Sequence, residues 1–521
     1  MLPRQPSSLP PSMVVNQKKR PRGLWHELAR SNSHDPRPSK RRRYQRSDDT
    51  TDDEPLSSDD SDGYYILEYA PEPSTGLCNS MDANGGPGEA ETKVEDWEDL
   101  KELFGRAAEQ YESDDVNEAL PLLRGVIHEC HRLMLLYEDP SVLFAVPLTH
   151  SKSREPISIS SSSKPQKKCK CKESPTAFHA ILGTALFLMG NLIAQDASVA
   201  VADEPSTPAT YWLAALDVFE TGENLPGRTS GRGCEAPEDW RMAVVWGRTL
   251  VAVADEALTL SQERERSGTA APPSAPEPKW PSPAASPFAA IAMRRPPASR
   301  RITLANAAPH ELLLLAMDQF TRGIFHMPHP AHALENDAPM DTARPFSRAT
   351  ELFTIAREVL ALAERLPDPA ERARWATWAD SMLQQMDMEG DTTRAEWRGP
   401  VTRARGRCWL VVGTVGMEDM EAMGEERGWA EVLDSEEADE AREALTRAVE
   451  FFERATGSAK GEFEMDADDG EEAAELRVFL TESLLSLANL TKDSDEEKRE
   501  ELYRRAQLLG GDELEGMDTD D

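Results

Sequence analysis

Apolar residues recur three or four positions apart along nearly the whole chain from Trp97 onward. This spacing places them on one face of an α-helix, and runs typical of β-strands are nearly absent. Proline residues and a Gly-Gly pair bound many of the segments, as expected at helix ends. We therefore expect an all-α fold, with helices over residues 95–111, 115–137, 175–195, 207–221, 237–262, 309–326, 344–366, 369–388, 400–415, 436–456, 471–490 and 495–508.

Four of these segments share a small residue, a large residue four positions later and a small residue three further on. This is the pattern of the second helix in a tetratricopeptide pair, where small residues let neighbouring helices touch and the large one fills the groove. The Trp-x2-Leu-Gly-x2-Tyr half of the repeat is missing throughout. The first residues of two of the triplets, Ala316 and Ala349, are 33 positions apart, which is near one repeat length. We predict a tetratricopeptide-like helical-pair array, with an irregular helical bundle as the alternative. The four triplets are Ala215/Phe219/Gly222, Ala316/Phe320/Gly323, Ala349/Phe353/Ala356 and Ala441/Leu445/Ala448.

Composition divides the chain into three parts. Residues 1–94 form a basic and then acidic region that we expect to be disordered, and residues 511–521 form an acidic tail. The helical array would occupy residues 95–510, with disordered insertions near 141–173, rich in Ser and Lys, and near 263–305, rich in Pro and Ala. Two further stretches, Met417–Glu437 and Glu462–Glu472, are predicted to be acidic loops.

Charge is distributed unevenly along the chain. Residues 1–46 hold 12 Lys and Arg and two acids, a charge of +10, which leaves −46 for the rest of a chain whose net charge is −36. Such an acidic body repels phosphate backbones. We expect no direct nucleic-acid binding by the body, so any contact with RNA would use the basic arm.

The basic arm contains two clusters separated by a polar linker, which is the layout of a bipartite nuclear import signal. A nonspecific polybasic tail is the alternative. An acidic tract, residues 47–62, follows the arm, and in it Ser57 precedes Asp60, which suits an acid-directed kinase. The residues assigned to the import signal are Lys18, Lys19, Arg20, Arg22, Lys40, Arg41, Arg42 and Arg43.

Two groups of histidines resemble metal sites. His128 and His131 flank Cys130, but helical geometry turns Cys130 into the core and His128 away from it, and no further ligands lie nearby. His326, His329 and His332 fall in a loop with two prolines, which favours a structural role.

No phosphate-binding loop, nucleophile elbow or kinase signature is present in the sequence. The six cysteines include no CxxC pair, as expected of free thiols in a reducing compartment. We expect no catalytic, cofactor or metal site. Thr176–Ala194 has no ionised side chain and is nearly long enough to cross a bilayer, yet its small residues also suit a buried helix, which we favour.

Three stretches, KKRPRGL, LLRGVIHECHRLM and FHAILGTALFLMGNL, resemble segments of the fungal enhancer of translation termination family. That family also includes a nuclear negative regulator of a prolyl-hydroxylase-like dioxygenase. The likeness is strongest over Trp97–Phe219. It implies a nuclear, all-α, tetratricopeptide-like protein without catalytic activity, and it supports the import signal at Lys18–Arg22.

The expected function is that of a non-enzymatic nuclear regulator or scaffold, required for efficient translation termination and linked to control of gene expression under stress. It would bind an import receptor, and it would hold a protein partner on the concave face of the helices, such as a termination or mRNA-processing factor. One alternative is an inhibitor-type partner of a 2-oxoglutarate dioxygenase that regulates a transcription factor. Another is an RNA-associated factor that uses the basic arm. The sequence leaves the oligomeric state open.

Overall fold

A computed structural model describes residues 87–113, 115–144, 173–202, 204–225, 239–267, 286–297, 301–304, 308–328, 347–388, 394–459 and 469–510. These residues form α-helices and short 3₁₀-helices without a strand, so the predicted all-α fold is confirmed. The helices are α2 (Pro87–Glu112), α3 (Val116–Leu136), α4 (Ala177–Gln195), α5 (Pro208–Glu223), α7 (Trp240–Ser267), α8 (Pro287–Arg294), α9 (Pro309–His326), α11 (Arg348–Ala363), α12 (Pro369–Met388), α13 (Arg394–Arg427), α14 (Trp429–Leu433), α15 (Glu436–Ala459), α16 (Asp469–Asn489) and α17 (Glu496–Gly510), with η1 (Pro140–Leu143), η2 (Ala197–Val199) and η3 (Asp493–Asp495).

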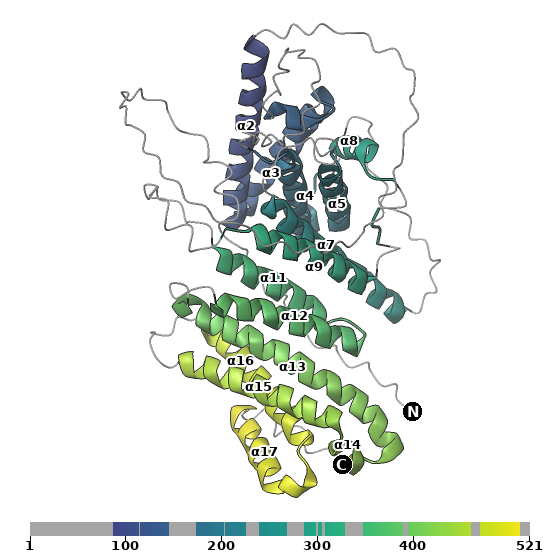
Figure 1. Cartoon of the computed structure of the whole chain (residues 1–521), viewed down its shortest axis with the longest axis vertical. Helices are drawn as coiled ribbons and strands as arrows, with labels where there is room; N and C mark the ends of the chain where they lie inside the picture. The colour runs from purple at the N-terminus through teal and green to yellow at the C-terminus, as the bar shows by residue number, and fades with distance from the viewer. Residues whose placement is uncertain are drawn as a thin grey trace, which may run out of the picture.

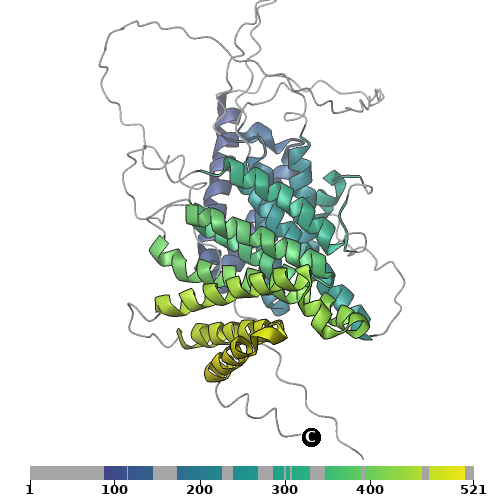
Figure 2. The same ribbon diagram turned by 60° about the horizontal axis from the view of Figure 1, so that its bottom comes forward.

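Within the described residues the long helices associate in six consecutive pairs: α2 with α3, α4 with α5, α7 with α9, α11 with α12, α13 with α15, and α16 with α17. The first helix of each pair also packs against the first helix of the next. The pairs therefore stack in chain order from one end of the molecule to the other (Figure 1), and α11 to α17 keep that order in the turned view of Figure 2. This arrangement is the predicted tetratricopeptide-like array.

A glycine in the first helix and a phenylalanine in the second hold several pairs together. A Cβ on Gly247 of α7 would lie 2.5 Å from the ring of Phe320 of α9, and one on Gly406 of α13 would lie 2.5 Å from the ring of Phe452 of α15. In the second pair a Cβ on Gly183 of α4 would lie even closer to the ring of Phe219 of α5. Since both phenylalanines predicted as groove fillers in the second and third pairs are fully buried, the small–large–small pattern has the packing role that we expected.

The half of the repeat motif that the sequence analysis found missing is present in a degenerate form. Three first helices, α4, α7 and α13, have a glycine at the position of the motif's glycine, namely Gly183, Gly247 and Gly406. In α2, Trp97, Leu100 and Phe104 occupy the Trp, Leu and Tyr positions and are fully buried, while Lys101 replaces the glycine. No first helix among the described residues carries the full Trp-x2-Leu-Gly-x2-Tyr motif, because its positions are filled by different residues in different pairs.

One triplet was assigned to the wrong kind of helix. Ala349/Phe353/Ala356 lies on α11, which is the first helix of its pair, whereas Ala316/Phe320/Gly323 lies on a second helix, α9. The interval of 33 residues between them is therefore not a repeat length. Phe353 is half-buried and contacts Trp397, with ring centroids 5.1 Å apart.

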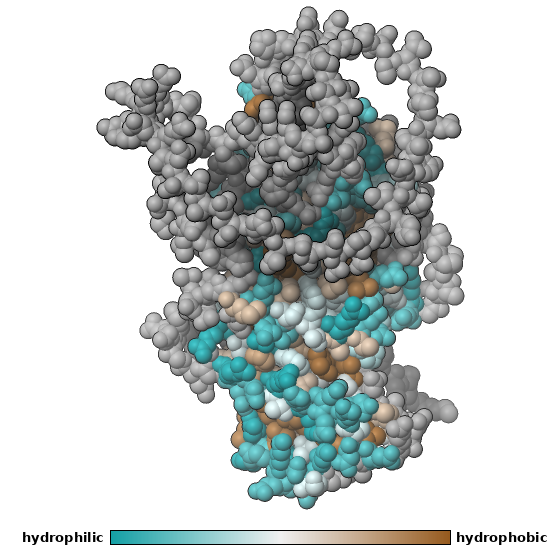
Figure 3. Space-filling model, viewed as in Figure 1, coloured by the Kyte–Doolittle hydropathy of each residue, from teal (hydrophilic) through white to brown (hydrophobic). Residues whose placement is uncertain are grey.

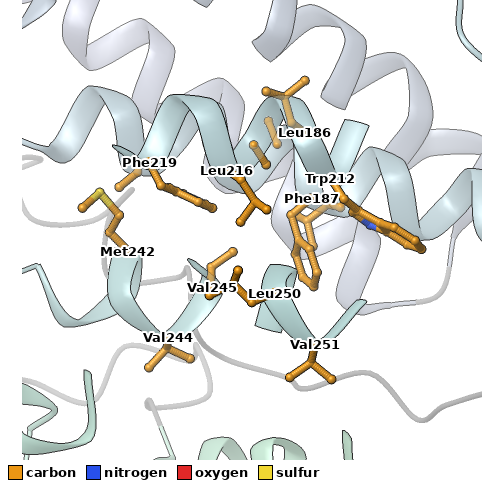
Figure 4. Packing of buried hydrophobic residues seen from close by; sticks show 14 of the residues in the cluster. Leu186, Phe187, Trp212, Leu216, Phe219, Met242, Val244, Val245, Leu250 and Val251 are labelled. Atoms are coloured by element: carbon orange, nitrogen blue, oxygen red, sulfur yellow. The ribbon is translucent and has the colours of Figure 1, made fainter. Parts of the chain in front are cut away.

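The apolar helix α4 lies in the centre of the first half of the molecule. It is long and apolar enough to span a membrane, but 89 % of its most apolar window is buried inside the structure. Figure 4 shows its Leu186 and Phe187 beside Trp212 and Leu216 of α5 and opposite Val245 of α7. This packing fits the buried-helix interpretation of Thr176–Ala194.

The core has two parts that meet on α13. One hydrophobic cluster extends from Trp97 to Cys408, and a second extends from Leu410 to Ala506. The helix that joins them is longer than the predicted 400–415, because α13 continues to Arg427 and α14 follows directly. The prediction of an acidic loop over Met417–Glu437 was therefore wrong, since most of that stretch is helical.

Two other boundaries differ from the sequence-based expectation. α8 forms at 287–294, inside the Pro/Ala-rich insertion that we expected to be disordered, and packs against α3 and α5. Pro287 begins α8, and the Oγ of Ser286 accepts a hydrogen bond from the Ala289 amide at 3.2 Å, so Pro and Ser cap a helix here. In addition, α2 begins at Pro87 rather than near residue 95. The acidic tail and most of both insertions lie outside the described residues.

Candidate functional site

The residues predicted from charge lie outside the part of the chain that the structure describes. These are the eight lysines and arginines of the import signal and the candidate phosphorylation site Ser57. His329 and His332 lie outside it too, while His326 ends α9. These assignments stay predictions from sequence.

The histidine group on α3 is arranged as helical geometry predicts. Cys130 is fully buried and His128 is exposed. Burial raises the pKa of the Cys130 thiol well above its usual value, which makes it unreactive. Among the described residues, no group of three or more His, Cys, Asp or Glu could hold a metal ion.

Aromatic and arginine side chains gather on the first helices of the last three pairs. On α11, the guanidinium of Arg357 lies 5.7 Å from the centre of the Phe353 ring, one turn away. Phe353 in turn contacts Trp397 near the start of α13. Since positions four apart share one side of a helix, Phe353 and Arg357 face the same way. Arg357 is exposed, while both rings are half-buried.

Two further arginines on α13 extend this surface toward α16. Arg403 donates to Glu472 at 2.8 Å. Arg407 donates to both carboxylate oxygens of Glu364, at 3.0 and 2.7 Å, and its guanidinium lies 5.1 Å from the centre of the Phe479 ring. We call the set Phe353, Arg357, Trp397, Arg403, Arg407 and Phe479 the first-helix face.

Arg357 differs from its two arginine neighbours because, within the described residues, it makes no ion pair. Partial loss of hydration lowers the pKa of Arg357, Glu358 and Glu475 raise it, and the positive charges of Arg407 and Arg403 lower it further. An anionic group placed beside Arg357 would relieve this repulsion. Figure 3 shows hydrophobic and hydrophilic side chains intermingled over this half of the molecule.

Arginine and aromatic residues are the side chains that most often carry the binding energy of a protein–protein interface. Here they lie together on rigid helices, exposed or half-buried rather than enclosed in the core. Sequence analysis found the helices but missed this face, because its members come from three segments more than 120 residues apart at the extremes. A run of arginines in "RAEWRGPVTRARGR", residues 394–407 of an acidic body, was the available signal.

The fold and this face define a class of protein: an α-helical repeat array that offers a surface to other macromolecules. No protein-family model matches the sequence, and comparison with curated proteins gives no match. Family membership is therefore not established by these comparisons.

Solved structures similar to this chain include three of the nuclear import adaptor Nro1. One, from S. pombe, is 14 % identical with a TM-score of 0.43, covering 83 % of this chain and 96 % of that one. A second, described as the hypoxic regulator of sterol synthesis Nro1, has the same identity and TM-score and covers 83 % and 93 %. Another crystal form of the S. pombe protein is 13 % identical, with a TM-score of 0.43 over 85 % and 96 % of the two chains. At these values the likeness transfers no partner and no residue role to this chain.

Proposed function

We propose that this protein is a non-enzymatic regulatory adaptor that binds a protein partner through the first-helix face and acts in the nucleus. The observation that carries the proposal is the position of Arg357, an exposed arginine without an ion pair in the described part, which lies over the Phe353 ring and is close enough to Arg403 and Arg407 for their charges to act on it. A partner could place an acidic side chain against Arg357 and an apolar side chain against the aromatic rings of the first-helix face.

The nuclear part of the proposal rests on the basic clusters of the arm. Nro1 is described as a nuclear import adaptor, and a similar role is a natural candidate for an array with its own import signal. The family resemblance implies two more specific roles for such an adaptor. One is to support translation termination, and the other is to inhibit a 2-oxoglutarate dioxygenase.

An RNA-associated role through the basic arm is the second candidate. The charge distribution supports it for the arm alone, because the body carries −46 and would repel a phosphate backbone. The proposed division into residues 1–94, 95–510 and 511–521 places this arm outside the helical array.

We expect that replacing Lys18, Lys19, Arg20 and Arg22 with alanine will shift a fluorescent fusion of the full chain from the nucleus to the cytoplasm. Replacing Lys40–Arg43 as well should abolish accumulation, since the two clusters of a bipartite signal bind one receptor together. Fluorescence microscopy of living cells measures the nuclear-to-cytoplasmic ratio.

A matched control removes four charges of the opposite sign by changing Asp48, Asp49, Asp52 and Asp53 to asparagine. This variant should stay nuclear. Unchanged nuclear accumulation after loss of both basic clusters would contradict the assignment of the import signal.

A further inference from the structure

The junction between the third and fourth pairs is built differently from the others. At the other four junctions the second helix of one pair packs closely on the first helix of the next, as α5 does on α7 and α12 on α13. Here α9 and α11 pack less closely along their lengths: α11 packs on α7 and meets the end of α9 through the buried Arg348, which donates to the carbonyl oxygens of Ile324 at 2.8 Å and Met327 at 3.2 Å. Large side chains of α12 also contact α9: Trp375 donates to Nδ1 of His310 at 3.1 Å, and Trp378 stacks on Phe320.

A buried carboxyl group lies at this junction. Glu351 of α11 is 0 % exposed, and neither of its carboxyl oxygens has a hydrogen-bond partner among the described residues. The positive charge that acts on Glu351 is Arg248 of α7, but Arg248 already donates to both oxygens of Glu358, at 2.7 and 3.0 Å.

The charged groups that act on Glu351 come from three helices. They are Arg248 of α7, Glu112 of α2 and Glu358 of α11 itself. Glu112 reaches this place because α2 runs across the row of first helices (Figure 1) and ends near α11. On the other sides of α11, Asp380 of α12 is bound to Arg405 of α13, and Arg403 and Arg407 of α13 act on Arg357 rather than on Glu351.

This environment opposes a negative charge on Glu351. An ionised carboxylate without hydration or hydrogen bonds is costly inside a protein. Burial raises the pKa of Glu351 to about 7, Arg248 opposes the rise, and the negative charges of Glu112 and Glu358 add to it. Below neutral pH the group is therefore an uncharged acid that the closed junction tolerates.

We propose that Glu351 makes this junction a proton-dependent latch. With the carboxyl group protonated, α11 stays packed on α7 and close to the end of α2. When the proton is lost to solvent, the carboxylate gains hydration if α11 moves away from α7, so the first three pairs and the last three pairs can separate locally. The first-helix face belongs to the last three pairs, so its position relative to α2–α9 would change with pH.

The direction of the effect follows from the two pKa values. The carboxyl pKa is about 7 in the closed junction and near its usual 4.5 in an open, hydrated one. The closed state is therefore favoured most at low pH, and the preference is lost as pH rises from 4.5 through 7. Between pH 6 and pH 8 the equilibrium constant for opening should rise about tenfold.

Hydrogen exchange of the full-length protein at pH 6 and pH 8, corrected for intrinsic exchange rates, tests the latch without any partner. We expect the equilibrium constant for opening at the α7 and α11 amides, obtained from their exchange, to be about tenfold larger in the wild type at pH 8 than at pH 6. Glu351→Gln, which is uncharged at both values, should show equal opening. Glu256→Gln on α7 is the matched control. Burial also raises the pKa of Glu256, and Asp255 and Glu263 add to the rise. Unlike Glu351, however, Glu256 is only half-buried. It should keep the wild-type pH dependence.

Equal protection of the wild type at both pH values would overturn the latch, as would a Glu351→Gln variant that keeps the tenfold difference. Glu351→Met gives a second uncharged variant if glutamine disturbs the fold. The result is independent of the proposed adaptor function, because a chain that binds no partner through the first-helix face would still show the pH-dependent exchange.

Discussion

Gly247→Ala will destabilise the protein by about 2 kcal/mol, because the added Cβ of α7 would lie 2.5 Å from the Phe320 ring. The ring cannot move aside easily, since Phe320 is fully buried and stacks on Trp378 with centroids 6.0 Å apart. Alanine is the better helix former by up to about 1 kcal/mol, so the steric cost has to exceed that gain. Urea unfolding followed by circular dichroism at the helix band measures the free energy of unfolding.

The same substitution at Gly125 of α3 is the control. A Cβ there would meet Leu103 at 3.5 Å, an ordinary van der Waals distance. Gly125→Ala should therefore be neutral or stabilising by up to about 1 kcal/mol. Equal effects of the two substitutions would show that the glycine–phenylalanine contact does not hold the third pair together.

We expect Arg248→Ala to cost about 3–5 kcal/mol, the range measured when one member of a buried ion pair is removed. Arg248 is 7 % exposed, and its guanidinium lies 2.7 Å from a carboxylate oxygen of Glu358. Loss of the arginine leaves Glu358 without its ion-pair partner and removes the positive charge that opposes the raised pKa of the buried Glu351. The cost should be largest above pH 7, where Glu351 is ionised.

Arg365→Ala is the matched control, because Arg365 forms an ion pair with Asp255 that links α7 to the turn after α11, across the same junction. Both members of that pair are exposed, so removal should cost less than about 1 kcal/mol. Thermal and urea unfolding of the two variants at pH 6 and pH 8 compare them directly. A cost for Arg248→Ala no greater than that for Arg365→Ala would contradict the assignment of a buried, stability-determining ion pair.

Helix positions could be predicted from the sequence because apolar periodicity is local. The predicted 175–195 and 309–326 agree closely with α4 and α9. Pairing was harder to predict, since Gly247 and Phe320 are 73 residues apart with an insertion between them. The end of α13 was missed because its acidic composition was taken as the sign of a loop, although Met417, Met420 and Met423 recur every three residues there and pack into the second cluster.

The candidate site was not predictable in the same way. Charge patterns indicated the basic arm, but the face around Arg357 depends on how α11, α13 and α16 lie beside one another. Burial of Glu351 was also hidden, because a glutamate on an amphipathic helix normally faces solvent. Both features follow from packing between pairs rather than from local sequence.

The most direct test of the adaptor proposal compares Arg357→Glu with Arg374→Glu in full-length tagged protein, captured from nuclease-treated nuclear extract at high salt. Both arginines are exposed and lie over an aromatic ring, Arg357 at 5.7 Å from the centre of Phe353 on α11 and Arg374 at 5.6 Å from that of Trp375 on α12. Mass spectrometry should find a protein partner that is retained by the wild type and by Arg374→Glu and is lost from Arg357→Glu. Binding through the first-helix face would be contradicted if Arg357→Glu retained every protein partner of the wild type. It would also be contradicted if nuclease treatment and high salt removed all partners from the wild type.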